Sequence, residues 1–354
     1  MHKFYTSSFD ASIYLQQPDQ NAGRDEILEV GKLYYGTIKD IYRTLIKFDV
    51  SNLETGSNWK AYLNLKAANS EEIPLEYTIY ANAVSQSWTM GTGTKFDNIT
   101  SDGVSWKYRN GIDKWVSYDT TGGTAVYTAN TTGSANAEGG VWYLSGSASQ
   151  SFNYESDDVR MDVTNLVSQW ISGSFANNGM IIHHDLNAEN DDLDYGVLKF
   201  FSKETNTIYQ PKLEIVWDDS NISTGSLAPV TGSAEDGYKV DVTNLKTQYE
   251  ANTKIKVRVK GRDKYPLKSF GSTFSYDESK YLPSTTYYQL EDYITKEIVF
   301  PFGDYTKVSC DTISNYFIMD LSTLPINRTY LLKLKIVEGG ISTIIDDKLK
   351  FEII

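Results

Sequence analysis

The chain has 354 residues and a formal net charge of −13, and 40% of its residues are hydrophobic. An acidic chain is a poor match to nucleic acid, because each neutralised phosphate needs a Lys or Arg. The single cysteine, Cys310, excludes an intrachain disulfide framework, and we expect it in the core rather than as a reactive thiol. No apolar run reaches the ~18 residues that span a bilayer, and no secretory signal is visible. These features favour a soluble protein made in a cytosol, with no nucleic-acid or membrane partner.

Charge and tryptophan divide the chain into two parts. Residues 1–219 carry 29 acidic and 16 basic side chains, whereas residues 220–354 carry 17 of each. All seven tryptophans lie between Trp59 and Trp217. The 26 tyrosines, with plentiful Gly, Ser, Thr and Asn, favour strands and turns over helices. We therefore predict an all-β chain with a large domain over residues 1–217, a linker over 218–236 and a second region over 237–354.

Within the first part, apolar and polar residues alternate over residues 34–49, 59–66 and 76–84, which is typical of sandwich strands. Residues 85–150 are rich in Gly, Ser, Thr and Trp and are expected to form long loops. One short helix is predicted at about 162–172, capped by Asp162 and ended by Gly173. Its apolar face would carry Leu166, Val167, Trp170 and Ile171. Strands are expected again at 179–183 and 209–217.

The second part begins with a polar segment that reads as a linker. Strict alternation predicts a strand at 254–260, with cations on one side that suit either a solvated sheet face or a basic binding face. Further strands are expected at 286–291, 296–301, 305–310, 315–320, 329–337 and 343–353. About seven strands in this length predict one or two small immunoglobulin-like β-sandwiches over 237–354.

A series of short motifs runs through the first part in a fixed order: Asp10-Ala11, Glu29-Val30-Gly31, residues 43–53 from Arg43 to Leu53, Trp88-Thr89-Met90-Gly91, residues 162–170 from Asp162 to Trp170, and Ser202-Lys203-Glu204 before Leu213. In this order they resemble the DNRLRE family over residues 8–217. The resemblance implies a β-jelly-roll sandwich related to carbohydrate-binding modules. The chain departs from extracellular members in lacking a secretion signal and a wall-anchoring context.

The second part resembles a C-terminal module of tailed-phage virion proteins, in residues 262–266, 281–288, 301–302, 306–311 and 327–330. This resemblance implies a non-enzymatic structural component of the neck, tail or baseplate region. Its partners would be other virion proteins, in a symmetric homo-oligomer or attached to a ring. The protein would be made in the host cytoplasm, built into the virion and released by lysis.

Aromatic residues in and beside the long loops are the ligand-binding candidates: Trp88, Trp106, Tyr108, Trp115, Tyr118 and Trp142. Aromatic faces stack on the C–H faces of sugars and give rigid contact area. The rings predict a glycan site, with host surface polysaccharide as the partner. The chain would then be a glycan-binding module of a bacterial or phage adhesion protein. The alternative is that the rings pack the loops onto the sandwich or onto a neighbouring subunit.

An acidic segment offers oxygen ligands for calcium through Asp185, Glu189, Asp191, Asp192 and Asp194. The spacing is not that of an EF-hand, so a solvated acidic loop is the alternative. The preceding His183 and His184 could begin a metal site, but neighbours in a strand point to opposite faces. No cofactor other than structural calcium is indicated.

Catalytic motifs are not apparent: there is no nucleophile elbow, phosphate loop or HExxH. The acidic pair Asp157-Asp158 would suit a glycosidase only within a cleft. The family positions Arg43, Asp49, Asp162, Trp170 and Glu204 are interpreted as fold-specifying residues rather than as a site. We therefore predict that the chain is not an enzyme, with a polysaccharide hydrolase as the remaining alternative.

Overall fold

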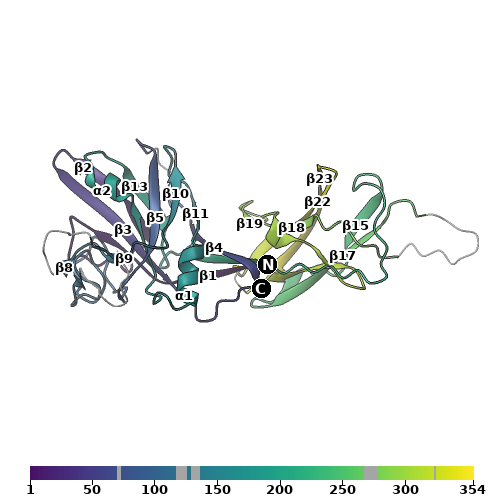
Figure 1. Cartoon of the computed structure of the whole chain (residues 1–354), viewed down its shortest axis with the longest axis horizontal. Helices are drawn as coiled ribbons and strands as arrows, with labels where there is room; N and C mark the ends of the chain where they lie inside the picture. Colours follow the sequence, from purple (N-terminus) through teal and green to yellow (C-terminus); the bar gives the residue numbers. More distant parts are fainter. Residues whose placement is uncertain (70–72, 117–125, 129–135, 267–277, 323) are drawn as a thin grey trace, which may run out of the picture. The chain divides into compact units, whose positions relative to one another are not determined.

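The computed structural model describes residues 1–69, 73–116, 126–128, 136–266, 278–322 and 324–354 (Figure 1). Strands dominate these residues, and the helices among them are short, so the all-β class is confirmed. Two compact units are present. The large unit comprises Tyr5–Glu54 and Lys60–Glu214, and the C-terminal unit comprises Met1–Phe4, Thr55–Trp59 and Ile215–Ile354.

The structure differs from the expected domain limits in two ways. Met1–Phe4 and Thr55–Trp59 belong to the C-terminal unit although they lie in the first part of the sequence. Residues 218–236, expected as a linker, also belong to that unit. The Ser223 amide donates to the Cys310 carbonyl, and the Val230 amide donates to the Tyr281 carbonyl. Polar composition alone does not separate a linker from a loop that is bonded along a sheet.

Among the residues that the structure describes, the large unit is built on one extensive sheet. Its path runs β10-β5-β12-β3-β1-β14-β4-β11, with β2 beside β3 and β13 beside β2. The bounds are β1 His2–Tyr14, β2 Ile27–Tyr35, β3 Ile38–Phe48, β4 Ser57–Leu65, β5 Tyr77–Ala83, β10 Ala148–Phe152, β11 Val159–Asp162, β12 Met180–His184, β13 Gly196–Phe201 and β14 Lys212–Asp218.

Burial along β5 shows why these sequences form strands. Tyr77, Ile79 and Ala81 are buried, whereas Thr78 and Tyr80 between them are half-buried. This is the period-two pattern predicted for residues 76–84. The central strand β3 is instead buried without a break from Ile41 to Ile46, as expected where both faces of a strand are covered.

The two ends of the sheet are linked by the side chain of Gln150. Its amide oxygen accepts from the Arg160 backbone amide of β11 at 2.9 Å, and its amide nitrogen donates to the Asp158 carbonyl at 3.4 Å. Edge strands with unpaired backbone groups are prone to non-native pairing. The glutamine bridges β10 and β11 and brings the sheet close to a closed barrel.

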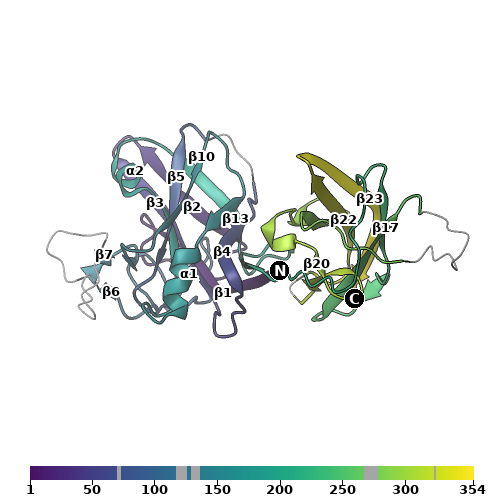
Figure 2. The same ribbon diagram turned by 45° about the vertical axis from the view of Figure 1, so that its right-hand side comes forward.

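Helix α1, Thr164–Ile171, confirms the predicted helix but not all of its details (Figure 2). The N-cap is Val163 rather than Asp162. The Asp162 carboxylate still accepts from the Thr164 amide at 3.0 Å. Leu166, Val167 and Trp170 are buried as predicted, but Ile171 is 49% exposed. A second helix, α2 at Leu186–Asn190, was not predicted; the Asp185 side chain caps it by accepting from the Asn187 amide.

Short strands belong to the long loops: β6 Trp115–Val116 pairs with β8 Asn136–Ala137, and β7 Val126–Thr128 pairs with β9 Val141–Tyr143. Buried side chains of this loop segment form one apolar cluster with residues of the sheet, which include Ile13, Leu45 and Ile181. The predicted loop-rich segment is therefore packed on the sheet rather than extended from it.

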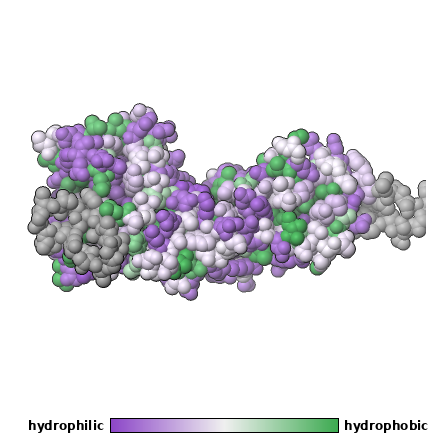
Figure 3. Space-filling view, viewed as in Figure 1, coloured by the Kyte–Doolittle hydropathy of each residue, from purple (hydrophilic) through white to green (hydrophobic). Residues whose placement is uncertain are grey.

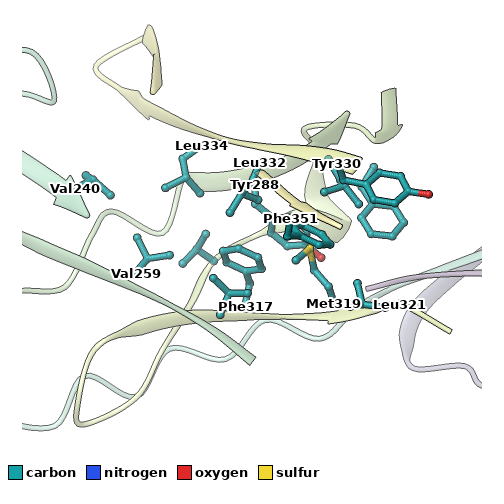
Figure 4. Close-up of a cluster of buried hydrophobic side chains, with 14 of the residues drawn as sticks. Val240, Val259, Tyr288, Phe317, Met319, Leu321, Tyr330, Leu332, Leu334 and Phe351 are labelled. Atoms are coloured by element: carbon teal, nitrogen blue, oxygen red, sulfur yellow. The ribbon is translucent and has the colours of Figure 1, made fainter. Parts of the chain in front are cut away.

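The C-terminal unit is a β-sandwich of two sheets around one core (Figure 4). Val259, Phe317 and Met319 of one sheet meet Tyr288, Leu332 and Leu334 of the other. One core means one sandwich rather than two. The orders are β15-β17-β21-β20 and β16-β23-β22-β18-β19, with β15 Tyr238–Val242, β16 Gln248–Tyr249, β17 Lys254–Asp263, β18 Thr286–Asp292, β19 Ile298–Phe300, β20 Ser309–Cys310, β21 Asn315–Asp320, β22 Arg328–Glu338 and β23 Ile341–Ile353; a 3-10 turn, η1, spans Asp304–Thr306.

Two cations on the basic side of β17 share one carboxylate of the same unit. Lys256 and Arg258 lie 3.0 and 2.9 Å from the carboxylate of Asp311. This ion pairing holds the pKa of the Asp311 carboxyl well below its usual range. Cys310 is buried, as expected, and burial raises the pKa of its thiol. None of the helices in the placed part of the chain has the length and hydropathy needed to cross a bilayer.

Candidate functional site

The most elaborate side-chain arrangement of the large unit centres on Arg43, which projects from β3 and is 2% exposed. Its Nε donates to Glu189 Oε1 at 3.0 Å, and its Nη2 donates to Glu189 Oε2 at 2.5 Å. Its Nη1 donates to the Gly139 carbonyl at 2.6 Å. The guanidinium carbon also lies 4.8 Å from the Trp106 ring centroid and 5.0 Å from that of Trp142. These residues are called the Arg43 cluster below.

The Arg43 cluster joins two groups of residues that the sequence analysis treated separately. Trp106 and Trp142 come from the aromatic candidates, and Glu189 comes from the acidic segment. A bidentate carboxylate and two ring faces match the planar guanidinium. Both charges are 2% exposed, so water is excluded from the pair. An arrangement so enclosed can hold α2 and the tryptophan loops on the sheet, but offers no access to a substrate.

A glycine makes room for this cluster. Gly139 has a φ of +78°, and a Cβ there would lie 2.5 Å from Arg43 Nη1 and 2.6 Å from Trp106 Cζ2. We expect Gly139→Ala to lower the free energy of unfolding by about 2–4 kcal/mol, through backbone strain and overpacking together. Gly36→Ala is the matched control, because Gly36 has a φ of +68° and nothing within 4 Å of the position that a Cβ would take. Urea unfolding of both variants measures the difference, and equal losses would contradict a packing role for Gly139.

The four candidate tryptophans are buried. Trp88, Trp106, Trp115 and Trp142 are 7, 3, 0 and 1% exposed and belong to one apolar cluster. Trp88 Nε1 donates to the Asn178 carbonyl at 2.7 Å, and Trp115 Nε1 donates to the Ser105 carbonyl at 3.1 Å. A sugar would reach these rings only if the loops opened, so in this structure the rings pack the loops. Tyr108 is half-buried, and Tyr118 lies outside the described residues.

The histidine pair ends β12 in the same region. His183 packs on Trp142 and Tyr80, with ring centroids 4.7 and 6.0 Å away, and its Nε2 is 3.1 Å from Asn82 Oδ1. His184 lies on the other face of the strand, where both of its ring nitrogens are buried without a hydrogen-bond partner. Burial lowers the pKa of each histidine from 6.5 to about 4. Both rings are therefore neutral at pH 7.

His184 is flanked by two tyrosines. The Tyr77 and Tyr195 ring centroids each lie 5.6 Å from that of His184. Tyr195 donates in turn to Asp191 Oδ2 at 2.8 Å. The two histidines thus have separate surroundings, and the structure does not bring them together as a pair of metal ligands.

The five carboxylates proposed for calcium point to different partners: Asp185 to the Asn187 amide, Glu189 to Arg43, Asp191 to Lys32 and Tyr195, Asp192 to Lys39, and Asp194 to the Gly196 amide. Lys32 is itself fully buried and bonds the Ala188 and Asp191 carbonyls at 2.6 Å. Within the described part of the chain, no three His, Cys, Asp or Glu side chains are grouped so as to hold a metal ion. Two of the five carboxylates, Glu189 and Asp191, are thus paired with Arg43 and Lys32, and the calcium site stays a prediction.

Asp10 of β1 is a buried acid, which was predicted only as part of the Asp10-Ala11 motif. It is 1% exposed, and its Oδ2 accepts from the Lys203 amide at 2.7 Å and from Ser7 Oγ at 3.1 Å. Its Oδ1 is buried without a partner. Burial raises the pKa of the carboxyl from 3.8 to about 6. Asp10 fastens β1 to the turn that follows β13, so the Asp10-Ala11 and Ser202-Lys203-Glu204 motifs meet in the fold.

A separate pocket of about 340 Å³ lies in the C-terminal unit. That volume is at the lower end of the range for small-molecule sites. Ser220 and Thr285 already donate to protein oxygens, and Lys307 is paired with Asp304 at 3.1 Å. The lining is largely polar, and consists of Ser220, Ile222, Ser284, Thr285, Tyr287, Asp304, Lys307 and Val308. Nothing in the sequence analysis singled out these residues.

Comparisons with known proteins give little further information. No family model and no curated protein matches the chain. One similar solved structure is a DUF4785 family protein from Legionella pneumophila, at 9% sequence identity and a TM-score of 0.19, over 99% of this chain and 61% of that one. The chain thus spans about 61% of the length of that protein, and a TM-score this low supports no inference about fold or function.

Proposed function

We propose that this chain is a non-enzymatic structural component of a tailed-phage virion, in the neck, tail or baseplate region. The observation that carries the proposal is the burial of the Arg43 cluster. The charged and aromatic residues that would form a reactive or ligand site are enclosed in mutual contacts, 3% exposed or less for Arg43, Trp106, Trp142 and Glu189. Residues used in this way serve the stability of a subunit. We infer the kind of particle, a tailed phage, from the resemblance of the second part to virion modules.

The surface supports a role in contacts with neighbouring subunits. On the face drawn in Figure 3, hydrophobic residues are scattered among hydrophilic ones on both units. Among the large side chains with the highest exposure are Phe96 at 87%, Ile112 at 79% and Tyr265 at 78%. Single exposed apolar residues are ordinary on a protein surface. Burying such a side chain in a subunit contact would nevertheless be favourable, by roughly 1.5–3 kcal/mol for full burial. The acidic charge of the first part would keep the free subunit soluble before assembly.

Particle purification tests the proposal. Particles from an infected lysate are banded by density, and their proteins are identified by mass spectrometry. We expect this chain to band with the particles and to stay with them through a high-salt wash. Recovery only in the unbanded soluble fraction would contradict a virion role.

Glycan binding is the second candidate, and the pocket of the C-terminal unit is the observation that favours it. Hydroxyl groups, a tyrosine and a Lys–Asp pair line the pocket, and such groups suit a polyhydroxyl ligand. A pull-down on host wall polysaccharide should retain the chain and lose it with Lys307→Ala. Equal retention of a Lys348→Ala control separates this site from general charge effects, because Lys348 lies on β23 and is 74% exposed.

A further inference from the structure

The β22–β23 hairpin of the C-terminal unit leaves part of one strand edge open. β23 pairs with β22 along one side from Ile341 onward, but on its other side β16 covers only Glu352 and Ile353. The hairpin turns at Gly339 and Gly340, whose φ values of +56° and +84° suit a two-residue turn. We call the segment that follows, Ile341–Ile345, the open edge.

Register shows which backbone groups of the open edge point outward. In a two-residue hairpin the residues that close the turn, here Glu338 and Ile341, form a hydrogen-bonded pair, and pair types then alternate. Ser342 and Ile344 are therefore in non-hydrogen-bonded pairs, and their amides and carbonyls point away from β22. The Val337 amide, opposite Ser342, accordingly donates to Thr285 on the far side. None of the described residues bonds to the outward groups of Ser342 or Ile344.

The open edge lacks the usual protection against pairing. Edge strands commonly carry a lysine, a proline or a bulge, which blocks the approach of another strand. The bulge here begins only after Ile345, where Asp346, Asp347 and Lys348 oppose the single residue Lys333. Before it, Ile341 is 67% exposed and Ile344 is 59% exposed. Five residues with two exposed isoleucines thus form an unguarded template.

We propose that the open edge pairs antiparallel with the same edge of a second copy of this chain, about a twofold axis at Thr343. This register places Ser342 opposite Ile344 of the second copy, and the reverse, so that all outward groups are bonded. An axis at Ser342 would place Ile344 opposite the glycine turn, and an axis at Ile344 would place Ser342 opposite the bulge. The Thr343 register is the one that uses both residues.

Side chains agree with this register. Ile341, Thr343 and Ile345 share the face that looks toward the sandwich core, and Ile345 packs against that core. In the paired edges the exposed Ile341 would lie beside Ile345 of the second copy and lose its contact with water. Because a segment paired with itself about a twofold closes the contact, the product is a dimer rather than a filament. Pairing of this kind holds whether or not the chain belongs to a virion.

Sedimentation equilibrium of the full chain tests the pairing. The wild type should show twice the monomer mass as concentration rises, and Ile344→Lys should remain monomeric, because an edge lysine blocks pairing. Ile313→Lys is the matched control: Ile313 is 63% exposed in the same unit but lies outside the edge, and its dimer should persist. Circular dichroism establishes that each variant is folded. A monomeric wild type, or a dimer that survives Ile344→Lys, would overturn the proposal.

Cysteine trapping tests the register independently. Thr343→Cys places two thiols across the axis in a non-hydrogen-bonded pair, where Cβ atoms are about 4.5–5.5 Å apart. Diamide, which takes up the two thiol hydrogens, should then give a covalent dimer. Ser342→Cys faces Ile344 instead and should cross-link far more slowly, and the native Cys310 is buried. Equal cross-linking at 342 and 343, or none at 343, would contradict the register.

Discussion

Replacing Glu189 by glutamine is expected to lower the free energy of unfolding by about 3–5 kcal/mol. The change leaves the Arg43 guanidinium charged, 2% exposed and without its counterion, and it turns an amide donor toward the arginine donors. Removing one partner of a buried ion pair has this cost, which is a large share of the ~5–15 kcal/mol that stabilises an ordinary domain. Urea unfolding followed by tryptophan fluorescence suits the measurement, because five of the seven tryptophans belong to the large unit.

Lys60→Ala provides the control for this experiment. Lys60 pairs with Asp162 at 3.3 Å, with both side chains nearly half exposed at 47 and 46%. An exposed pair contributes about 0–1 kcal/mol, so the variant should unfold close to the wild type. A loss below ~1 kcal/mol for Glu189→Gln would contradict the view that the Arg43 cluster holds the large unit together.

Acidification should also destabilise the large unit, with three buried groups setting the slope. His183 and His184 have lower pKa values in the folded chain than in the unfolded chain, so the unfolded chain binds their protons more tightly. Above pH 6.5 neither state binds these protons and full stability is present. Stability is then lost as the pH falls from 6.5 toward 4. The raised pKa of Asp10 acts in the opposite sense, because the folded chain gains its proton as pH falls through about 6. Near pH 5 the three groups together therefore bind about one more proton in the unfolded chain than in the folded chain. The free energy of unfolding then falls by roughly 1.4 kcal/mol for each pH unit of acidification.

Two substitutions separate these opposing contributions. Asp10→Asn removes the proton that the folded chain gains, so the difference in bound protons near pH 5 should rise to about two and stability should fall more steeply with acid. The same variant should be more stable at pH 7, because the buried carboxylate is charged there and the amide is not. His184→Phe removes an unpartnered buried imidazole and should flatten the slope to near zero. Urea midpoints between pH 4.5 and 7.5 report both effects. Identical slopes in the wild type and both variants would contradict the assignment of the acid response to these residues.

Much of the fold follows from local sequence. Period-two burial in residues 76–84 and the spacing of Leu166, Val167 and Trp170 reflect backbone geometry and can be predicted without a structure. The contribution of Met1–Phe4 to the C-terminal unit could not be predicted in this way. Phe4 packs on Phe300 at 6.1 Å between ring centroids, and nothing in the local pattern specifies a partner almost 300 residues away.

The candidate site shows the same division. The sequence identified Trp106, Trp142 and Glu189 as notable, but assigned them to different ligands. Their connection depends on Arg43, whose reach from β3 is a tertiary contact that composition and spacing do not encode. Gly139 likewise carries no local signal that separates it from other loop glycines, although its missing Cβ is what allows Arg43 to lie against Trp106. A buried arginine with aromatic neighbours can be recognised only when the fold is known.

The central claim is that this chain is built as a subunit whose notable residues stabilise it and whose surfaces assemble. Quantitative mass spectrometry of washed, density-banded phage particles, calibrated against a ring-forming particle protein of known copy number, tests that claim most directly. We expect a fixed copy number, in simple ratio to the ring and unchanged by washing. Absence from the particles, or a variable trace amount that washing removes, would contradict it.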